Sequence, residues 1–234
     1  MNTAKNTAGA AGLIYLVVVI TGMFSLAYIP KQLIDWNNST VTFNNITTSP
    51  SLFRIGIYCS IVCYVAFTFL LLLLYKLLRP VNESHARAML ILALLSVPIS
   101  FNNLQHQYAV LTITGKESIL QTIPVEDLQA KLMLSLQQYN DGILLATVFW
   151  GLWLFPFGLL VYRSGFMPKF SGILLMLGCL GYLVNFSGNT LFANYPQTGI
   201  GKYMRILPAV AEITTCGWLL FLGLKSKKNE KQKI

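Results

Sequence analysis

The sequence predicts an all-α, polytopic membrane protein: a transmembrane helix bundle of six transmembrane helices with both the N- and C-termini cytoplasmic. Three observations predict this fold class. Hydrophobic residues make up 55% of the 234 residues and charged residues only 11%, whereas a soluble protein carries about 25% charged residues. Several apolar stretches exceed the ~20 residues needed to cross a bilayer. The basic residues gather at the ends of these stretches and in the C-terminal segment KSKKNEKQKI, where they act as topology signals.

The apolar segments give the helices in order. The first is expected to end at Pro30 and is longer than the apolar part of a signal peptide, so we expect it to be retained. A polar stretch over 31–54 follows it. Pro124 and the acids after it mark a helix start. A single rod from 124 to 162 would be ~58 Å long, so we expect a bend at Gly142. The six predicted spans are 9–29, 55–75, 88–113, 142–162, 170–191 and 206–224.

The distribution of basic residues predicts the orientation. With the N-terminus inside, the inner segments hold 11 of the 17 Lys and Arg residues and the outer segments hold 6. The two short loops 76–87 and 163–169 are both basic and both inside, in agreement with the positive-inside rule. We therefore expect one transmembrane domain over 1–224 and a basic cytoplasmic tail over 225–234.

Polar side chains inside the predicted spans are the candidates for a functional site. An ionisable group at the centre of a span costs ~2.5–3.5 kcal/mol on the insertion scale, so each one needs a reason. At a rise of ~1.5 Å per residue, three helices place a polar side chain roughly 9 Å below the outer surface, and further polar groups lie above that layer. The pattern favours an outward-facing polar pocket. Its ligand-binding candidates are Asn102, His106, Asp141, Asn185, Arg205 and Glu212.

A second interpretation of these residues stays open. Asn, Gln and His hydrogen-bond across helices and can satisfy one another without any ligand. Under either interpretation a carboxyl inside the apolar core needs a proton or a cationic partner, because desolvation disfavours its charged form. We expect Glu212 to pair with Arg205 or His106, and most of all with Arg205, two turns away on the same helix face.

The sequence carries few catalytic or metal-binding motifs. HExxH, GxSxG, a P-loop and a paired-cysteine metal site do not occur. His85 and His106 lie on opposite sides of the membrane in the predicted topology, and His85 is expected to be solvated in a loop. The cysteines all fall in apolar runs and resemble small hydrophobes. We therefore expect no cofactor and no metal. Because the positive charge marks topology, we also expect no nucleic-acid partner.

Several blocks resemble a known family. They are SLFRIGI (51–57), LYKLLRPVNE (74–83), FWGLWLFPFGLLVYRSGFMPKFSGILLMLGCLGYL (149–183) and AEITTCGWLLFLGLK (211–225). They resemble the bacterial membrane-protein family of domain of unknown function 4386. The resemblance implies a prokaryotic protein of the cytoplasmic membrane with about six helices, and it implies no activity. The family's Gly-Glu pair in the last helix stands here as Ala211-Glu212, and its arginine before the second helix matches Arg54, which becomes a further candidate site residue.

Three function classes follow from these features. The first is a non-enzymatic membrane protein, surrounded by lipids, that binds or moves a small molecule or lipid through the outward polar pocket. The second is a membrane-embedded enzyme that uses Glu212 and His106 as an acid–base pair, and it is weakened because no nucleophile or metal ligand set accompanies them. The third is a structural or signalling subunit whose polar residues only hold the helices together. The oligomeric state does not follow from the sequence.

Overall fold

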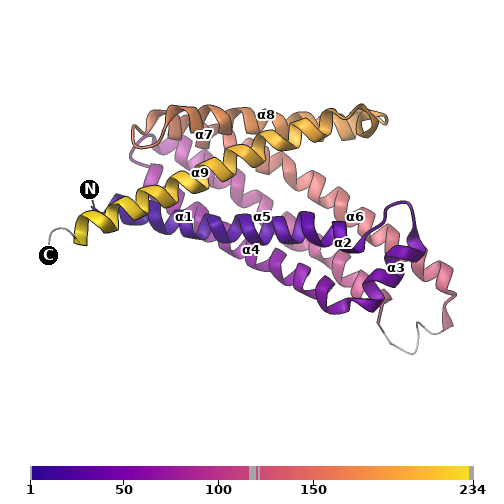
Figure 1. The fold of residues 1–234 in the computed structure, drawn as a ribbon. Coiled ribbons are helices and arrows are strands. Elements are labelled where there is room, and N and C mark those ends of the chain that lie inside the picture. The colour runs from indigo at the N-terminus through magenta and orange to yellow at the C-terminus, as the bar shows by residue number, and fades with distance from the viewer. Residues whose placement is uncertain (1, 116–119, 121, 232–234) are drawn as a thin grey trace. The chain divides into compact units, whose positions relative to one another are not determined.

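The computed structural model describes residues 2–115, 120 and 122–231, and side chains between residues 6 and 223 of that part. Six helical segments of this part are long and apolar enough to cross a membrane, namely Asn6–Leu33, Pro50–Leu78, Glu83–Ile113, Val125–Arg163, Lys169–Leu191 and Ile200–Gly223. The predicted all-α fold with six membrane-spanning helices is thereby confirmed. The individual elements are α1 (Asn2–Met23), a π-helical turn (Phe24–Tyr28), α2 (Ile29–Leu33), α3 (Ser39–Thr48), α4 (Pro50–Leu78), α5 (Glu83–Ile113), α6 (Val125–Leu152), α7 (Leu154–Arg163), α8 (Lys169–Leu191), a 3-10 turn (Tyr195–Thr198) and α9 (Ile200–Lys231) (Figure 1).

The chain divides into two units, which are described separately. Unit 1 consists of Met1–Val17, Ala66–Val97 and Leu144–Ile234, and unit 2 consists of Val18–Val65 and Pro98–Ile143. Of the predicted cytoplasmic tail over 225–234, the backbone is helical as far as Lys231, and 232–234 lie outside the described residues.

The first transmembrane segment continues beyond Pro30, so the predicted end at this proline was wrong. The chain widens into a π-helical turn at Phe24–Tyr28, in which the Ile29 N–H donates to the Phe24 carbonyl. Proline has no N–H to donate. It is therefore tolerated in the first turn of α2, which runs to Leu33.

The polar stretch after the first span contains a helix that was not predicted from the sequence. The Asn38 side chain caps α3 by accepting a hydrogen bond from the Val41 N–H at 3.0 Å, as N-cap residues do. Ile46 on this helix is completely buried. It joins the hydrophobic core of unit 2, which consists of Ile29, Leu33, Ile46, Phe53, Ile57, Val110, Leu132 and Leu136.

The long fourth segment breaks at Trp153 and not at Gly142. Pro156 cannot donate to the Leu152 carbonyl, so the α-helical ladder is interrupted where α6 ends and α7 begins. Gly142 instead provides space between α5 and α6. The Asn103 amide nitrogen donates to the Tyr139 carbonyl at 2.8 Å, and a Cβ on Gly142 would overlap the Asn103 side chain. The glycine therefore makes room for an asparagine that ties α5 to α6.

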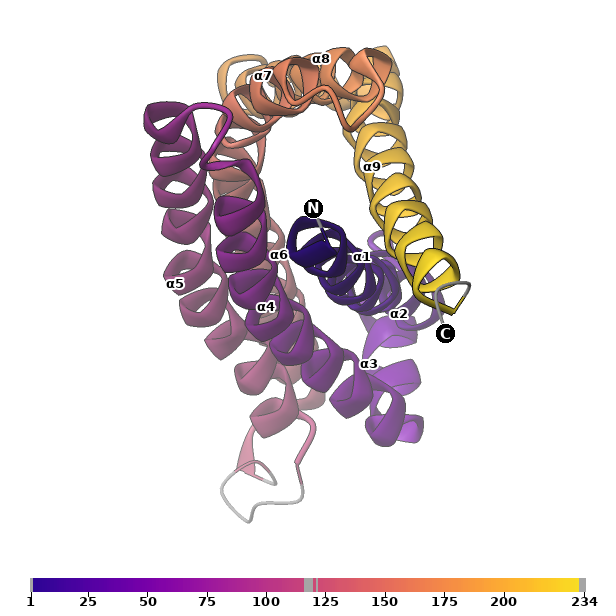
Figure 2. The ribbon, with the colours of Figure 1, turned by 90° about the vertical axis from the view of Figure 1, so that its left-hand side faces the viewer.

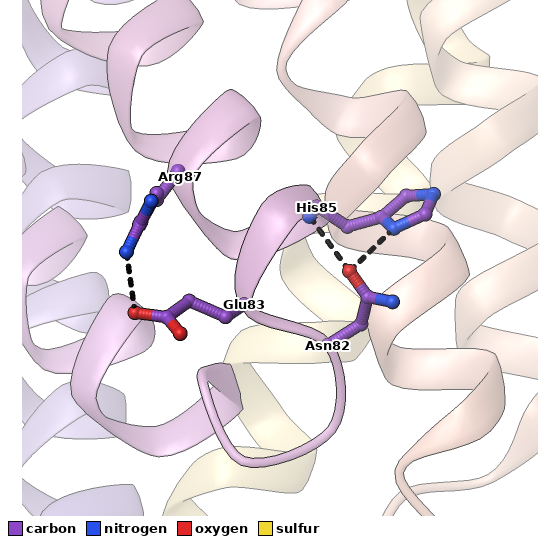
Figure 3. A network of polar contacts seen from close by, with 4 residues as sticks. All are labelled: Asn82, Glu83, His85 and Arg87. Carbon is purple, nitrogen blue, oxygen red and sulfur yellow. Dashed lines mark hydrogen bonds and ion pairs between the residues drawn. The ribbon is translucent and has the colours of Figure 1, made fainter.

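Residues at the start of α5 form a helix cap (Figure 3). The backbone N–H of His85 donates to Asn82 Oδ1 at 2.9 Å, and its Nδ1 lies 2.7 Å from the same oxygen. Because an amide oxygen only accepts, Nδ1 carries the hydrogen. His85 is thus a partly buried residue of the first turn, and the prediction of a solvated loop residue was wrong. Arg87 and Glu83 form an exposed ion pair at 2.8 Å, typical of residues four apart on a helix.

Unit 1 packs its helices through glycines. A Cβ on Gly158 of α7 would lie 2.6 Å from the carbonyl oxygen of Gly172 of α8, so the two backbones touch. Figure 2 shows α7 and α8 together at the top and α9 descending from them towards the C-terminal end. Small residues let transmembrane helices approach this closely. Close contacts at glycines also position the residues of the candidate site.

Candidate functional site

Glu212 lies in the middle of the last span. It stands twelve residues after Ile200 and eleven before Gly223, the two ends of that span, which places it ~16–18 Å from either end at ~1.5 Å per residue. α9 begins at Ile200, directly after Gly199 with a φ of 71°, and therefore six residues before the predicted start of the last span at 206. Pro208 lies inside the helix.

Two tyrosines hold the Glu212 carboxyl. The Tyr15 hydroxyl of α1 donates to Oε2 at 3.2 Å, and the Tyr182 hydroxyl of α8 donates to Oε1 at 3.1 Å. Each carboxyl oxygen therefore accepts one hydrogen bond, from a different helix. Tyr15 is completely buried, whereas Glu212 and Tyr182 keep part of their surface exposed. We call Tyr15, Tyr182 and Glu212 the tyrosine–glutamate cluster.

Glycines on α1 bring Tyr15 to Glu212. A Cβ on Gly9 would lie 2.8 Å from the Cα of Gly223, and a Cβ on Gly12 would lie 2.6 Å from the Leu220 nitrogen. The two helices thus run antiparallel with their backbones in contact. Cys216 closes the same contact by directing its thiol to the Gly12 carbonyl at 3.8 Å. One turn further along α1, Tyr15 meets the carboxyl.

Glycines on α8 bring Tyr182 to the same point. A Cβ on Gly181 would lie 2.6 Å from the Met204 carbonyl oxygen, and a Cβ on Gly178 would lie 3.1 Å from the Cα of Pro208. The Tyr182 ring in turn meets the Trp150 ring edge-on, with centroids 6.4 Å apart and an interplanar angle of 65°. Aromatic surface therefore surrounds one side of the cluster.

No positive group of the described chain pairs with Glu212. The ion pair between Arg87 and Glu83 is the one such pair in the part of the chain that the structure describes. Arg205 is exposed, and its Nε donates to the Gly201 carbonyl at 3.2 Å. The predicted pairing of Glu212 with Arg205 was wrong, because the carboxyl accepts hydrogen bonds from tyrosine hydroxyls of α1 and α8 instead.

Asn185 continues the polar face of α8 beyond Tyr182. It is buried, with 8% of its surface exposed, and lies one helical turn from Tyr182. The Asn189 side-chain amide donates to the Asn185 backbone carbonyl at 2.7 Å and lies 3.4 Å from Asn185 Oδ1. A Cβ on Gly201 would lie 3.0 Å from Asn185 Oδ1, which shows that this side chain faces α9.

The remaining predicted site residues lie in unit 2. Asn102 and Arg54 are exposed and His106 is partly buried. Asp141 is exposed as well, and it accepts a hydrogen bond from Gln137 Nε2 at 2.8 Å. On α5 the buried face carries Asn103 instead, with 4% of its surface exposed, so the expectation that Asn102 faces the interior was wrong.

The chemistry available to the cluster is narrow. A carboxyl with two phenol donors can bind a proton or a cation, and it can accept further hydrogen bonds on its free lone pairs. Within residues 2–115, 120 and 122–231, no three His, Cys, Asp or Glu residues lie close enough to hold a metal ion. Neither Tyr15 nor Tyr182 was predicted from the sequence as a site residue. Their spacing from Gly12 and Gly178 is the signal that could have found them.

Comparison with known proteins identifies a family. A family model described as Domain of unknown function (DUF4386) matches residues 10–223, which is most of the chain, so the chain belongs to this family. An uncharacterized protein of Archaeoglobus fulgidus is 34% identical over 85 residues, which amount to 35% of this chain and 46% of the relative. The chain therefore matches about half the length of this relative. No solved structure matches the chain.

Proposed function

We propose that this member of the DUF4386 family is a non-enzymatic membrane protein that binds or moves a small molecule or lipid, and that Glu212 is the polar anchor of its binding site. The observation that carries the proposal is a mid-span carboxyl that is held by two hydroxyls and lacks a cationic partner in the described chain. Ionisable groups in spans are costly and typically line substrate or ion pathways.

Hydrogen bonding between helices alone would not need a carboxyl here. An amide accepts from one tyrosine and donates to the other, so glutamine would join the three helices without burying an ionisable group. Glu212 also keeps part of its surface exposed, which leaves room for contact with a ligand. Beyond Tyr182, the buried Asn185 extends the polar face of α8 towards the Ile200 end of α9. We propose that a ligand enters from that end.

The cellular setting is part of the proposal. We place the protein in the cytoplasmic membrane of a prokaryote with both termini on the cytoplasmic side. The bias of Lys and Arg towards the inner segments supports this orientation. The antiparallel contact of α1 with α9 supports termini at the same end of unit 1.

Thermal unfolding of the purified protein in detergent tests the proposal. The probes are a total polar lipid extract and a panel of dodecyl amphiphiles with cationic, neutral and anionic heads. We expect at least one probe to raise the melting temperature of the wild type by several degrees, and we expect the shift to vanish in Glu212→Gln. Asp141→Asn is the matched control, since it makes the same chemical change at an exposed acid of α6, and it should keep the shift. Equal shifts in wild type and Glu212→Gln, or loss of the shift only in Asp141→Asn, would overturn the proposal.

A further inference from the structure

The ligand class follows from the charge balance of the tyrosine–glutamate cluster, and the inference rests on the proposed function of Glu212. We propose that the site takes a lipophilic organic cation, a bulky apolar molecule that carries one delocalised or quaternary positive charge. The three lines of support are the unpaired charge of the carboxyl, the chemistry of its two partners and the aromatic surface beside it.

Glu212 has no charged partner among the described residues. Both groups that touch Glu212 are neutral donors, so hydrogen bonding disperses the negative charge of the carboxylate and does not cancel it. A buried charge without a counter-ion is strongly unfavourable in a low-dielectric medium. Among the described side chains, Cys216 is the further titratable group that acts electrostatically on the cluster, through Tyr15, and it directs its thiol to the Gly12 carbonyl. A cation from outside the chain, or a proton, therefore has to complete the site.

The shape of the partners favours a large cation over a small one. A metal ion prefers several oxygen ligands from carboxylates, carbonyls or water, and the cluster offers one carboxyl whose two oxygens already accept hydrogen bonds. An organic cation needs no such coordination shell. It needs one negative charge nearby and apolar or aromatic surface for its body.

Aromatic rings provide that surface. The partly exposed Tyr182 brings its ring to the carboxyl through its own hydroxyl, whereas Tyr15 is completely buried and offers no surface to a ligand. The Trp150 ring extends the surface by its edge-on contact with Tyr182, and Trp150 is itself only partly buried. Rings of Tyr and Trp attract a positive charge through their quadrupole, and this attraction is strongest where water is excluded.

A pair of ions of matched shape separates charge from hydrophobicity. Tetraphenylphosphonium and tetraphenylborate have nearly the same size and opposite charge, and their binding to the detergent-solubilised protein is measured by equilibrium dialysis. We expect the phosphonium to bind the wild type and to bind Glu212→Gln about tenfold or more weakly, while the borate does not bind in a Glu212-dependent manner. Trp150→Leu should weaken phosphonium binding several-fold. Tyr28→Phe is the control, because Tyr28 is exposed and lies outside the cluster, and it should bind as the wild type does.

The contrary results are distinct. Equal binding of the two ions, or phosphonium binding that is unchanged in both Glu212→Gln and Trp150→Leu, would overturn the cation class. If the phosphonium fails to bind while a neutral or anionic amphiphile still shifts the melting temperature through Glu212, the cation class falls and the proposed function stands. If no probe responds to Glu212, both fall. A cooperative unfolding transition of each variant shows that it is folded.

Discussion

Removing the Tyr15 hydroxyl tests whether the tyrosine–glutamate cluster holds unit 1 together. Tyr15→Phe keeps the buried ring of a completely buried residue and deletes only the donor that reaches Glu212 Oε2 at 3.2 Å. Hydrogen bonds between membrane helices average about 0.6 kcal/mol and reach about 1.7, whereas bonds to charged groups are worth about 1.5–3 kcal/mol. The distance is longer than the ~2.5–2.7 Å of the strongest charge-assisted hydroxyl bonds. We therefore expect a loss of about 1–1.5 kcal/mol.

A double-mutant cycle isolates this bond from other effects of the substitutions. The free energy of unfolding is measured for the wild type, Tyr15→Phe, Glu212→Ala and the double variant, in mixed micelles titrated with a denaturing detergent and followed by tryptophan fluorescence. The expected coupling energy between the two positions is about 1 kcal/mol or more, because neighbouring groups that share a bond are not additive. Tyr28→Phe, at an exposed tyrosine, should change the free energy by less than about 0.5 kcal/mol. A coupling energy below about 0.3 kcal/mol, within the scatter of independent sites, would refute the bond.

Three further predictions concern packing and topology. Gly12→Ala should lower the free energy of unfolding by about 1–3 kcal/mol, because the new Cβ would lie 2.6 Å from the Leu220 nitrogen. Gly217→Ala is the control in the same unfolding assay. A Cβ there would meet no atom within 4 Å, so this variant should be neutral or stabilising. Gly142→Ala should also destabilise, and its cost should fall sharply in an Asn103→Ala background, because the three atoms nearest to the new Cβ all belong to the Asn103 side chain; an unchanged cost would contradict this. Reporter fusions at the C-terminus and in the segment between α5 and α6 should lie on opposite sides of the membrane, and reporters on one side would exclude the orientation.

The spans could be predicted from the sequence because hydropathy and length decide them. All six predicted spans overlap the segments of the structure and differ from them at their ends. Pro30 was expected to end a helix, and it lies inside a helical segment. A proline can lie inside a helix where the backbone carbonyl that its N–H would bind does not need that hydrogen bond. At Pro30 a π-helical turn meets that condition, and hydropathy gives no sign of such a turn.

The faces of the helices could not be predicted in the same way. In a soluble helix the polar side faces water, so the periodicity of apolar residues shows which side is buried. In a membrane both the lipid-facing and the interior sides are apolar, and that contrast is lost. Asn102 and Asn103 are adjacent and equally polar, yet only Asn103 is buried. What distinguishes them is Gly142 on the facing helix, which leaves room for one asparagine side chain.

Glycine spacing is the sequence signal that bears most directly on the site. Gly9 and Gly12 are three residues apart on α1, as are Gly178 and Gly181 on α8, and both pairs make backbone contacts with α9. Residues three or four positions further along lie on the same helix face; these are Tyr15 after Gly12 and Tyr182 after Gly178. A polar side chain on a glycine-marked face must meet the partner helix at close range, so a mid-span carboxyl on that helix is its natural acceptor. Arg205 lies on the same helix as Glu212, and its spacing along that helix does not require the two side chains to touch. The glycines of α1 and α8 do require close contact with α9, so they predict the partners of the carboxyl better than the position of Arg205 does.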